Sequence, residues 1–253
     1  MPELPEVETI KRQIEPFVLK KYLLSISAVP DFSPQKLLSI KRYGKMLFME
    51  LEDIYVKIHL RLTGILTLKE IKDKQKYLFI IFCFEDQKLF LYDIRKFSEI
   101  KLINEEEMHK EISLLGKDAL SISWEEFKGM LSSSAKIKSL LLNQKKIAGL
   151  GNIYTDETLF RAKIHPLKIA CTIKEKQAKV LYKTMKQVVK KAIEMRGSSV
   201  RDYVDAYGNK GLFQKEHLVY GRKKKPCKVC KTTLEYIKVC QRGTVFCPNC
   251  QKL

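Results

Sequence analysis

Met46-Leu47-Phe48-Met49-Glu50-Leu51 is the first of several short segments, between residues 46 and 103, that are rich in β-branched and aromatic side chains. Polar turns separate these segments, a pattern that favours short strands joined by tight loops. It predicts an antiparallel β-sandwich in this part of the chain. The expected strands are Met46–Leu51, Ile54–Leu60, Gly64–Leu68, Tyr77–Phe84, Lys88–Asp93 and Ile100–Ile103.

Helices are expected on both sides of the strands. Ahead of them, four apolar residues recur at helical spacing and predict an amphipathic N-terminal helix: Val7, Ile10, Ile14 and Phe17. Beyond about residue 104 the pattern becomes helical again, and two segments fit the capping box, in which Ser or Thr precedes Glu by three residues. They are Ser123 with Glu126, and Thr172 with Glu175, the second opening a long helix that ends near Met195 with Gly197 just beyond.

The fold class predicted from these patterns is α+β, with three domains. Residues 1–112 form an N-terminal β-sandwich domain with its helix, residues 113–220 a helical domain, and residues 221–253 a cysteine-rich module. A chain of 253 residues with 45% hydrophobic content is long enough to bury one large core or two smaller ones.

The charge of the chain points to a polyanionic partner. Lys and Arg number 48 against 29 Asp and Glu, a net charge of +19. Part of this excess decorates solvated faces, but residues 221–253 concentrate it, as a phosphate-binding surface requires. This segment has a single acid, Glu235, and nine basic residues: Arg222, Lys223, Lys224, Lys225, Lys228, Lys231, Lys238, Arg242 and Lys252.

Neither a membrane span nor a secretory signal is expected. The longest apolar run, Tyr77–Phe84, is far shorter than the roughly 20 residues of a membrane helix. Met1 leads directly into an acidic segment, unlike a signal peptide. A cytoplasmic protein is therefore expected, and we expect it to be a monomer.

Four of the seven cysteines have the spacing of a metal site. Cys227 and Cys230 form one Cys-x2-Cys pair, Cys247 and Cys250 form a second, and sixteen residues separate the pairs. Two such knuckles are typical of one tetrahedral zinc with four thiolate ligands. Because all four positions are filled by protein, we predict one structural zinc ion and no organic cofactor. The remaining cysteines are expected to pack or to be bystanders: Cys83, Cys171 and Cys240.

The N-terminus contains a candidate reactive pair. If Met1 is removed, the chain begins with the secondary amine of Pro2 beside the carboxylate of Glu3. An α-amino group has a pKa of about 7.7–8.0, so a substantial fraction is a neutral nucleophile at neutral pH, and such amines form Schiff bases. The alternative is that Pro2 and Glu3 only begin a helix, for which both residue types are suited.

The whole stretch Pro2-Glu3-Leu4-Pro5-Glu6-Val7-Glu8-Thr9 resembles the opening of the formamidopyrimidine-DNA glycosylase family, and the resemblance extends to about Gln251. It implies that Pro2 is the catalytic nucleophile and that Glu3 supplies a proton. Three further stretches carry it: Arg42-Tyr43-Gly44-Lys45, Leu150-Gly151-Asn152-Ile153-Tyr154-Thr155-Asp156-Glu157 and Gln241-Arg242-Gly243-Thr244.

The resemblance also assigns roles beyond the N-terminus. Lys45 would assist base release, and Arg242, in a zinc-finger hairpin, would contact DNA phosphates and donate a proton in the second elimination. The helical domain would be a helix-two-turns-helix domain with a lesion-recognition loop. Two loops, His59 to Gly64 and Asp93 to Phe97, would fill the gap left by an extruded base. The implied DNA-binding residues are Glu6, His59, Leu62, Arg95, Lys96, Phe97, Lys138 and Asn152.

The chain departs from the family pattern at several positions. Leu62 stands where methionine is usual, and Ser98 replaces a usual glycine. Residues 74–77 lack the histidines commonly found there, which puts one phosphate contact in doubt. The segment 28–38 is shorter than typical, which should trim a surface loop.

The expected function is a bifunctional DNA glycosylase and abasic-site lyase that excises oxidised purines from damaged double-stranded DNA, with elimination at both flanking phosphates. The loop from Arg201 to Gly208 resembles the branch that removes 8-oxoguanine and formamidopyrimidines. Three alternatives stay open: an endonuclease VIII-like enzyme for oxidised pyrimidines, a non-catalytic zinc-ribbon DNA-binding protein, and a zinc-ribbon protein associated with RNA or ribosomes.

Overall fold

The computed structural model describes all residues, 1–253, and the chain divides into two compact units. Unit 1 comprises residues 1–114 and 192–214, and unit 2 comprises residues 115–191 and 215–253. The units are groups of residues in mutual contact, and the three-domain division at 112/113 and 220/221 stays a prediction. No helix is both long and apolar enough to cross a membrane.

Unit 1 contains the predicted β-sandwich. Its five-stranded sheet has the order β2-β1-β7-β8-β6, its four-stranded sheet has the order β3-β4-β5-β9, and all strand pairs are antiparallel. The strands are β1 (Tyr22–Ile26), β2 (Gln35–Lys36), β3 (Ser39–Tyr43), β4 (Met46–Glu50), β5 (Tyr55–His59), β6 (Gly64–Thr67), β7 (Leu78–Phe84), β8 (Lys88–Asp93) and β9 (Glu99–Ile103). The six strands expected from the sequence are therefore confirmed to within two residues at each end.

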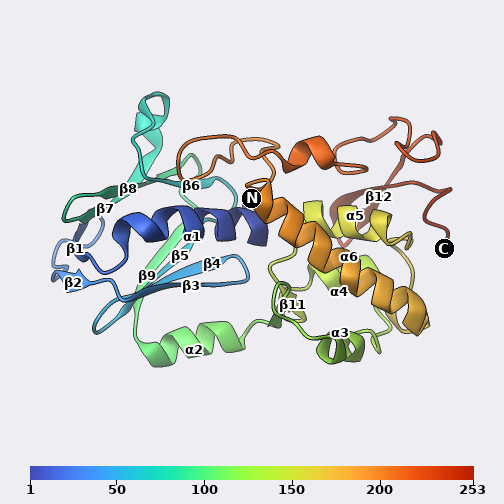
Figure 1. The fold of residues 1–253 in the computed structure, drawn as a ribbon, viewed down its shortest axis with the longest axis horizontal. Coiled ribbons are helices and arrows are strands. Elements are labelled where there is room, and N and C mark those ends of the chain that lie inside the picture. The colour runs from blue at the N-terminus through green and yellow to red at the C-terminus, as the bar shows by residue number, and fades with distance from the viewer. The chain divides into compact units, whose positions relative to one another are not determined.

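Helix α1 (Leu4–Val18) packs against β3 and β4 of one sheet and β6 of the other (Figure 1). Val7, Ile10 and Ile14 are almost fully buried in the sandwich core, as predicted. Phe17 was expected on the same face, but it is 38% exposed and meets Tyr207 edge-on, with 6.2 Å between ring centroids. The next residue, Val18, is buried in its place.

Unit 2 is mostly helical. Its elements are β10 (Lys117–Asp118), α3 (Trp124–Met130), α4 (Ile137–Leu142), β11 (Ile147–Ala148), α5 (Asn152–Arg161), η2 (Ala170–Thr172) and the zinc hairpin, formed by β12 (Glu235–Val239) and β13 (Arg242–Phe246). Helix α2 (Glu105–Ser113) and the 3₁₀ helix η1 (Lys72–Tyr77) belong to unit 1, while α6 (Glu175–Glu194) and η3 (Phe213–Glu216) continue from one unit into the other.

One of the two predicted helix starts is correct. Ser123 caps α3: its Oγ accepts the Glu126 N–H, and the Glu126 carboxylate accepts the Ser123 N–H. Thr172 does not cap α6. Its hydroxyl donates to the carbonyl of Ile169, the residue before η2, and α6 begins three residues later at Glu175, because Thr172 belongs to this short 3₁₀ turn and is not the residue that precedes α6.

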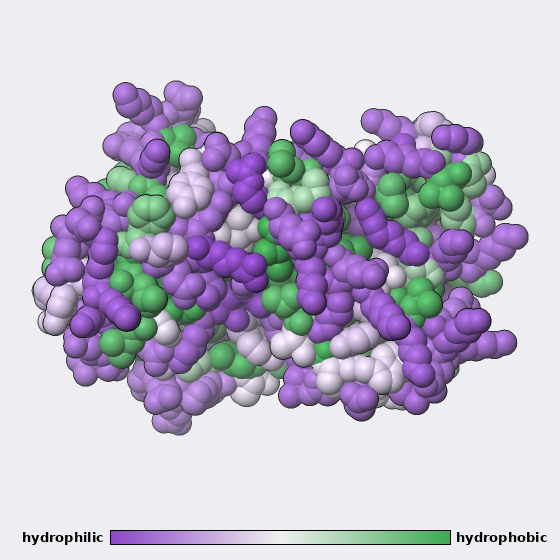
Figure 2. Space-filling view, in the orientation of Figure 1, coloured by the Kyte–Doolittle hydropathy of each residue, from purple (hydrophilic) through white to green (hydrophobic).

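The long helix ends close to the predicted point. Its last residue is Glu194, and Gly197 has a φ of +77°. The Gly197 N–H donates to the Ala192 carbonyl at 2.7 Å, the six-residue closure of a glycine-terminated helix. On the face shown in Figure 2 hydrophilic residues predominate, as expected for a chain with a net charge of +19.

Candidate active site and metal centre

The N-terminal residues are buried and held by one carboxylate. Pro2 is buried, and Glu3 and Glu6 are 3% and 1% exposed. The two carboxylate oxygens of Glu6 accept different backbone groups: Oε2 accepts the Glu3 N–H at 2.7 Å, and Oε1 accepts the Ser198 N–H at 2.8 Å. Glu6 therefore joins the start of α1 to a segment 192 residues away in the sequence.

Close packing reinforces this junction. Gly197 lies against Glu6, where an added Cβ would come within 2.7 Å of Glu6 Oε1. Gly211 in turn approaches the carbonyl oxygens of Gly197 and Arg196, and a Cβ there would come within 2.3 Å and 2.5 Å of them. Both positions require glycine, because any side chain would displace the segment that contacts Glu6.

Charged side chains surround the terminal amine, which in this chain belongs to Met1. Its pKa lies below the usual value, chiefly because burial disfavours the ammonium form. Lys45 and Arg201 lower this pKa further, whereas Glu3 and Glu6 raise it. Two cations and two carboxylates therefore act on an amine at this end of the chain, and the lowered pKa favours its neutral, nucleophilic form.

Lys45 is positioned by a tight turn. Gly44 and Lys45 form the two-residue loop between β3 and β4, and Gly44 has a φ of +57°, which glycine adopts without strain. Arg42 fixes this loop to α1: its guanidinium donates to the Gly44 carbonyl at 3.0 Å and to Glu8 Oε2 at 2.7 Å. Lys45 is only 8% exposed.

The two loops that were predicted to fill a gap in the duplex share one carboxylate. Asp93, 1% exposed, accepts the Thr63 hydroxyl at 2.5 Å and the Arg95 N–H at 3.0 Å. Ser98 donates both its N–H and its hydroxyl to Asp93, each at 2.6 Å. Ser98 also packs against Gly64, so the residue that replaces the usual glycine makes hydrogen bonds that glycine could not.

The tips of these loops present apolar and basic side chains to solvent. Leu62 is 40% exposed and Phe97 is 56% exposed, and both Arg95 and Lys96 are exposed. Large apolar side chains exposed on two loops that share hydrogen bonds to Asp93 suit insertion into a partner. His59 precedes the first loop, and its Nδ1 accepts the Arg61 N–H at 3.0 Å. Burial and the nearby Arg61 charge lower the pKa of His59 to about 4, so the imidazole is neutral at neutral pH.

In unit 2, Lys138 of α4 has no exposed surface. Its ammonium pairs with Asp156 Oδ1 at 2.6 Å and donates to Thr244 Oγ1 at 2.7 Å. Burial raises the pKa of Asp156 to about 7, against the opposing effect of the Lys138 charge. The predicted contact between Lys138 and DNA would require the ammonium to leave these partners.

Asn152, the first residue of α5, also contacts the zinc hairpin. Its amide nitrogen donates to the Gly243 carbonyl at 2.9 Å. The adjacent Arg242 begins β13 and is exposed to solvent. The structure therefore brings Asn152 and Lys138 to the turn that bears Arg242, a proximity that sequence spacing could not indicate.

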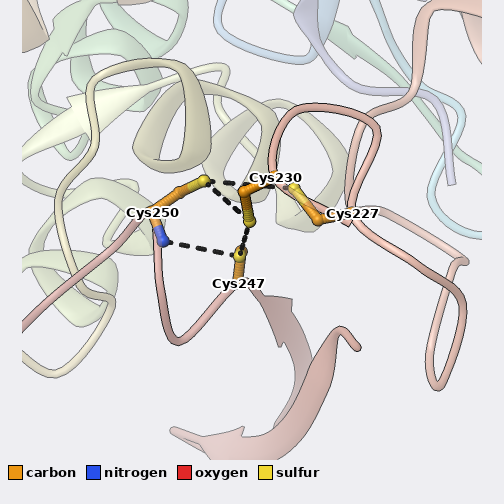
Figure 3. Close-up of side chains that lie close together, drawn as sticks. All are labelled: Cys227, Cys230, Cys247 and Cys250. Atoms are coloured by element: carbon orange, nitrogen blue, oxygen red, sulfur yellow. Dashed lines mark hydrogen bonds between the residues drawn. The ribbon is translucent and has the colours of Figure 1, made fainter. Parts of the chain in front are cut away.

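The four cysteines form a zinc site. Their sulfur atoms all lie within 4.8 Å of one another, and individual pairs are separated by 3.4–4.0 Å (Figure 3). A tetrahedral zinc with bonds of about 2.3 Å requires sulfur separations of about 3.8 Å, which lies within the range of these three pairs. The Val229 and Cys250 N–H groups donate to the Cys227 and Cys247 sulfurs at 3.4 Å, as in zinc knuckles. The protein fills every coordination position, so the zinc is structural.

Several positioning residues could not be identified from the sequence. Asp93 lies in a quoted motif, but only the fold shows that it joins both loops. In the sequence Asp156 is one polar residue among others near the start of a helix. Its partner Lys138 lies 18 residues away, so no local pattern indicates the pairing. Arg42 and Ser198 gave no local signal, because their partners Glu8 and Glu6 lie 34 and 192 residues away.

Comparisons with known proteins agree with this architecture. Three family models match consecutive parts of the chain: the formamidopyrimidine-DNA glycosylase N-terminal domain at residues 1–100, the formamidopyrimidine-DNA glycosylase H2TH domain at residues 115–204, and the zinc finger found in FPG and IleRS at residues 224–253.

Full-length relatives match as well. The chain is 41% identical to a formamidopyrimidine-DNA glycosylase of Solibacter usitatus, over the whole of both chains. Lactococcus lactis Fpg, solved with DNA containing an abasic site, has a TM-score of 0.90 and 33% identity, covering 99% of this chain and 100% of that one. MutM in complex with DNA containing carbocyclic 8-oxo-G has a TM-score of 0.89 and 33% identity, covering all of both chains.

Proposed function

Because the chain belongs to the formamidopyrimidine-DNA glycosylase family, we propose that it excises oxidised purines from double-stranded DNA and then cleaves the strand at the abasic site. The observation that carries this proposal is the N-terminus itself. Pro2 is buried beside Glu3, in surroundings that depress the pKa of an amine. A helix start in a binding module would need none of these charges.

In the proposed mechanism, removal of Met1 exposes the Pro2 amine. Its nitrogen attacks the sugar C1′ and loses its proton, and the bond from C1′ to the base breaks, with the base taking up one proton as it leaves. Glu3 donates a proton to the ring oxygen, the ring opens, and the nitrogen and C1′ form an iminium ion. Elimination at the two flanking phosphates follows, and water then releases Pro2. We assign the assistance of base departure to the Lys45 ammonium, which lies near the same amine.

The proposed DNA contacts fall into two groups, the residues that bind phosphates and the side chains at the loop tips. His59, Lys96, Asn152 and Arg242 would bind phosphates, and Arg242 would also donate a proton in the second elimination. His59 is neutral at neutral pH with Nδ1 occupied, so it would donate from Nε2. Glu6, the other implied DNA-binding residue near the terminus, already has both oxygens bonded to backbone, and its proposed role is to position Pro2 and Glu3.

The exposed loop tips would offset the cost of base extrusion. Unstacking and unpairing a nucleotide costs a few kcal/mol, and inserted side chains recover part of it. Leu62, Arg95 and Phe97 are the proposed inserts, supported by their exposure and by the Asp93 hydrogen bonds that join their loops. Leucine in place of methionine preserves an apolar wedge.

The lesion class rests on the relatives, one of which was solved with DNA carrying an 8-oxoguanine analogue. The runner-up is an endonuclease VIII-like preference for oxidised pyrimidines. Excision rates on duplexes that differ only in 8-oxoguanine or thymine glycol distinguish the two, and faster release of thymine glycol would reverse the assignment. The protein would act as a monomer in the cytoplasm, where chromosomal DNA lies. Light scattering in solution tests whether it is a monomer.

Borohydride trapping tests the covalent mechanism. Protein that begins at Pro2 is mixed with duplex DNA containing an abasic site, and sodium borohydride reduces any Schiff base to a stable adduct. The matched control is the same protein with the Pro2 nitrogen acetylated. We expect an adduct with the first and binding without an adduct with the second. Equal trapping of both, or trapping of neither, contradicts the proposal.

A further inference from the structure

The Arg242 turn comprises the loop Cys240–Gln241 together with the start of β13, residues 242–245, and three side chains from α4 and α5 hold it. Asn152 donates to the Gly243 carbonyl at 2.9 Å. Lys138 donates to Thr244 Oγ1 at 2.7 Å and to the Gly243 carbonyl at 3.4 Å. Asp156 Oδ2 accepts the Val245 N–H at 3.5 Å. Each of the three residues after Arg242 therefore has a partner on α4 or α5.

The Lys138–Asp156 pair is the buried centre of this arrangement. The side chains are 0% and 2% exposed, and their charged atoms lie 2.6 Å apart. A buried ion pair is costly to form and contributes little net stability compared with an apolar pair of similar size. Buried polar groups of this kind can instead specify which of several arrangements a structure adopts. Here the element whose arrangement is specified is the Arg242 turn.

We propose that Lys138, through its buried pairing with Asp156, is a positioning residue that fixes the Arg242 turn of the zinc hairpin to α4 and α5. The ammonium is directed into the protein, to Asp156, Gly243 and Thr244, and has no exposed surface with which to meet a phosphate. Its contribution to DNA binding is therefore made through Arg242. This inference depends on the proposed function only in taking Arg242 as a DNA contact.

Zinc alone does not supply this restraint. The ligands nearest to Arg242 in the sequence are Cys247, which follows β13, and Cys230, which precedes the hairpin. Arg242 lies at the opposite end of β13 from Cys247, beside the loop of Cys240 and Gln241. Both loop residues have positive φ, +47° and +58°. A two-stranded hairpin is marginally stable by itself, so its far end needs tertiary contacts to hold one position.

The test uses the full-length, zinc-loaded protein. The double variant Lys138→Met with Asp156→Leu replaces the pair by apolar groups of similar size, so it avoids a stranded buried charge. The matched control is Lys128→Met with Glu175→Leu, which removes an exposed ion pair of the same chemistry in the same unit. Zinc content and unfolding midpoint confirm that both double variants are folded.

The first readout is hydrogen exchange of the amides from Gly243 to Val245, which needs no DNA. We expect exchange at least tenfold faster in the Lys138/Asp156 variant and unchanged in the control. Unchanged exchange in the folded Lys138/Asp156 variant would overturn the proposal. This readout is independent of the proposed function, since it is unaffected by whether the protein cleaves or even binds damaged DNA.

The second readout is affinity for abasic-site DNA as a function of salt, in backgrounds with Arg242 and with Arg242→Ala. A lost charge-assisted hydrogen bond weakens binding by about tenfold to hundredfold. We expect the Lys138/Asp156 variant to lose affinity only while Arg242 is present. A loss that persists unchanged beside Arg242→Ala, with a salt slope reduced by about one, would identify Lys138 as a direct phosphate contact and overturn the proposal.

Discussion

The N-terminal site and the zinc hairpin position their reactive groups by different means. At the N-terminus, the Glu6 carboxylate accepts the Glu3 and Ser198 N–H groups. In the hairpin, four cysteines gather around zinc, and the buried Lys138–Asp156 pair holds the turn. The first site therefore depends on one carboxylate that joins two segments distant in the sequence, and the second depends on a metal and on a buried ion pair within unit 2. The two sites should fail under different perturbations.

Removal of zinc should have the largest effect and should act on one site only. Structural zinc contributes about 10–16 kcal/mol in zinc-finger peptides, far more than any single side chain. With zinc chelated, we expect amides of residues 227–250 to lose their protection from hydrogen exchange, and DNA affinity to fall with them. The Ser198 amide, bonded to Glu6, should stay protected. Loss of protection at both sites together would show that they are not independent.

Replacement of Glu6 should have the next largest effect, at the other site. Glu6→Ala leaves two buried N–H groups without acceptors, which should lower the free energy of unfolding by about 2–5 kcal/mol. Urea unfolding measures this loss, and borohydride trapping should slow while zinc content stays the same. Glu15→Ala on the same helix is the control, because it removes only a partly exposed pair with Lys11. Equal losses in the two variants would exclude the anchoring role of Glu6.

A third variant extends the comparison to the loops that join β5 to β6 and β8 to β9. Asp93→Asn keeps one acceptor but turns the other into a donor, which faces either the Thr63 donor at the Oδ1 position or the two Ser98 donors at the Oδ2 position. We expect a loss of about 1–3 kcal/mol in stability. Fluorescence of 2-aminopurine placed opposite an abasic site should report weaker insertion of Leu62 and Phe97.

The control for this variant is Asp86→Asn, at an exposed pair with Lys21. Unchanged fluorescence in Asp93→Asn, with the stability loss present, would separate Asp93 from the insertion of the loops.

The effect that is smallest at neutral pH, and that grows only under acidic conditions, is the pH response of His59. Its pKa in the folded protein is about 4 against about 6.5 in the unfolded chain, so the unfolded state binds more protons between these values. Stability should therefore fall as pH drops from 6.5 to 4, and His59→Gln should remove this part of the dependence. Imidazole resonances followed by NMR measure the pKa, and a midpoint near 6.5 would contradict the burial of His59.

Local signals in the sequence predicted helices, strands and the zinc site. Contacts between residues that lie far apart in the sequence leave no such signal, and these contacts could not be predicted. Strand segments, the Ser123 cap and the cysteine spacing each act within a few residues, and the structure confirms them. Strands β1 to β3 went unpredicted because they are largely exposed or half-exposed, with little apolar alternation. Lysine is rarely buried, so the internal role of Lys138 had no sequence signal at all.

The proposed mechanism requires a bond between the Pro2 nitrogen and the sugar, which mass analysis of the trapped complex can locate. After borohydride reduction and digestion, we expect the added sugar mass on the N-terminal peptide, which begins at Pro2 and has lost Met1. Sugar mass on a peptide containing Lys45, with the N-terminal peptide unmodified, would show that Pro2 is not the nucleophile.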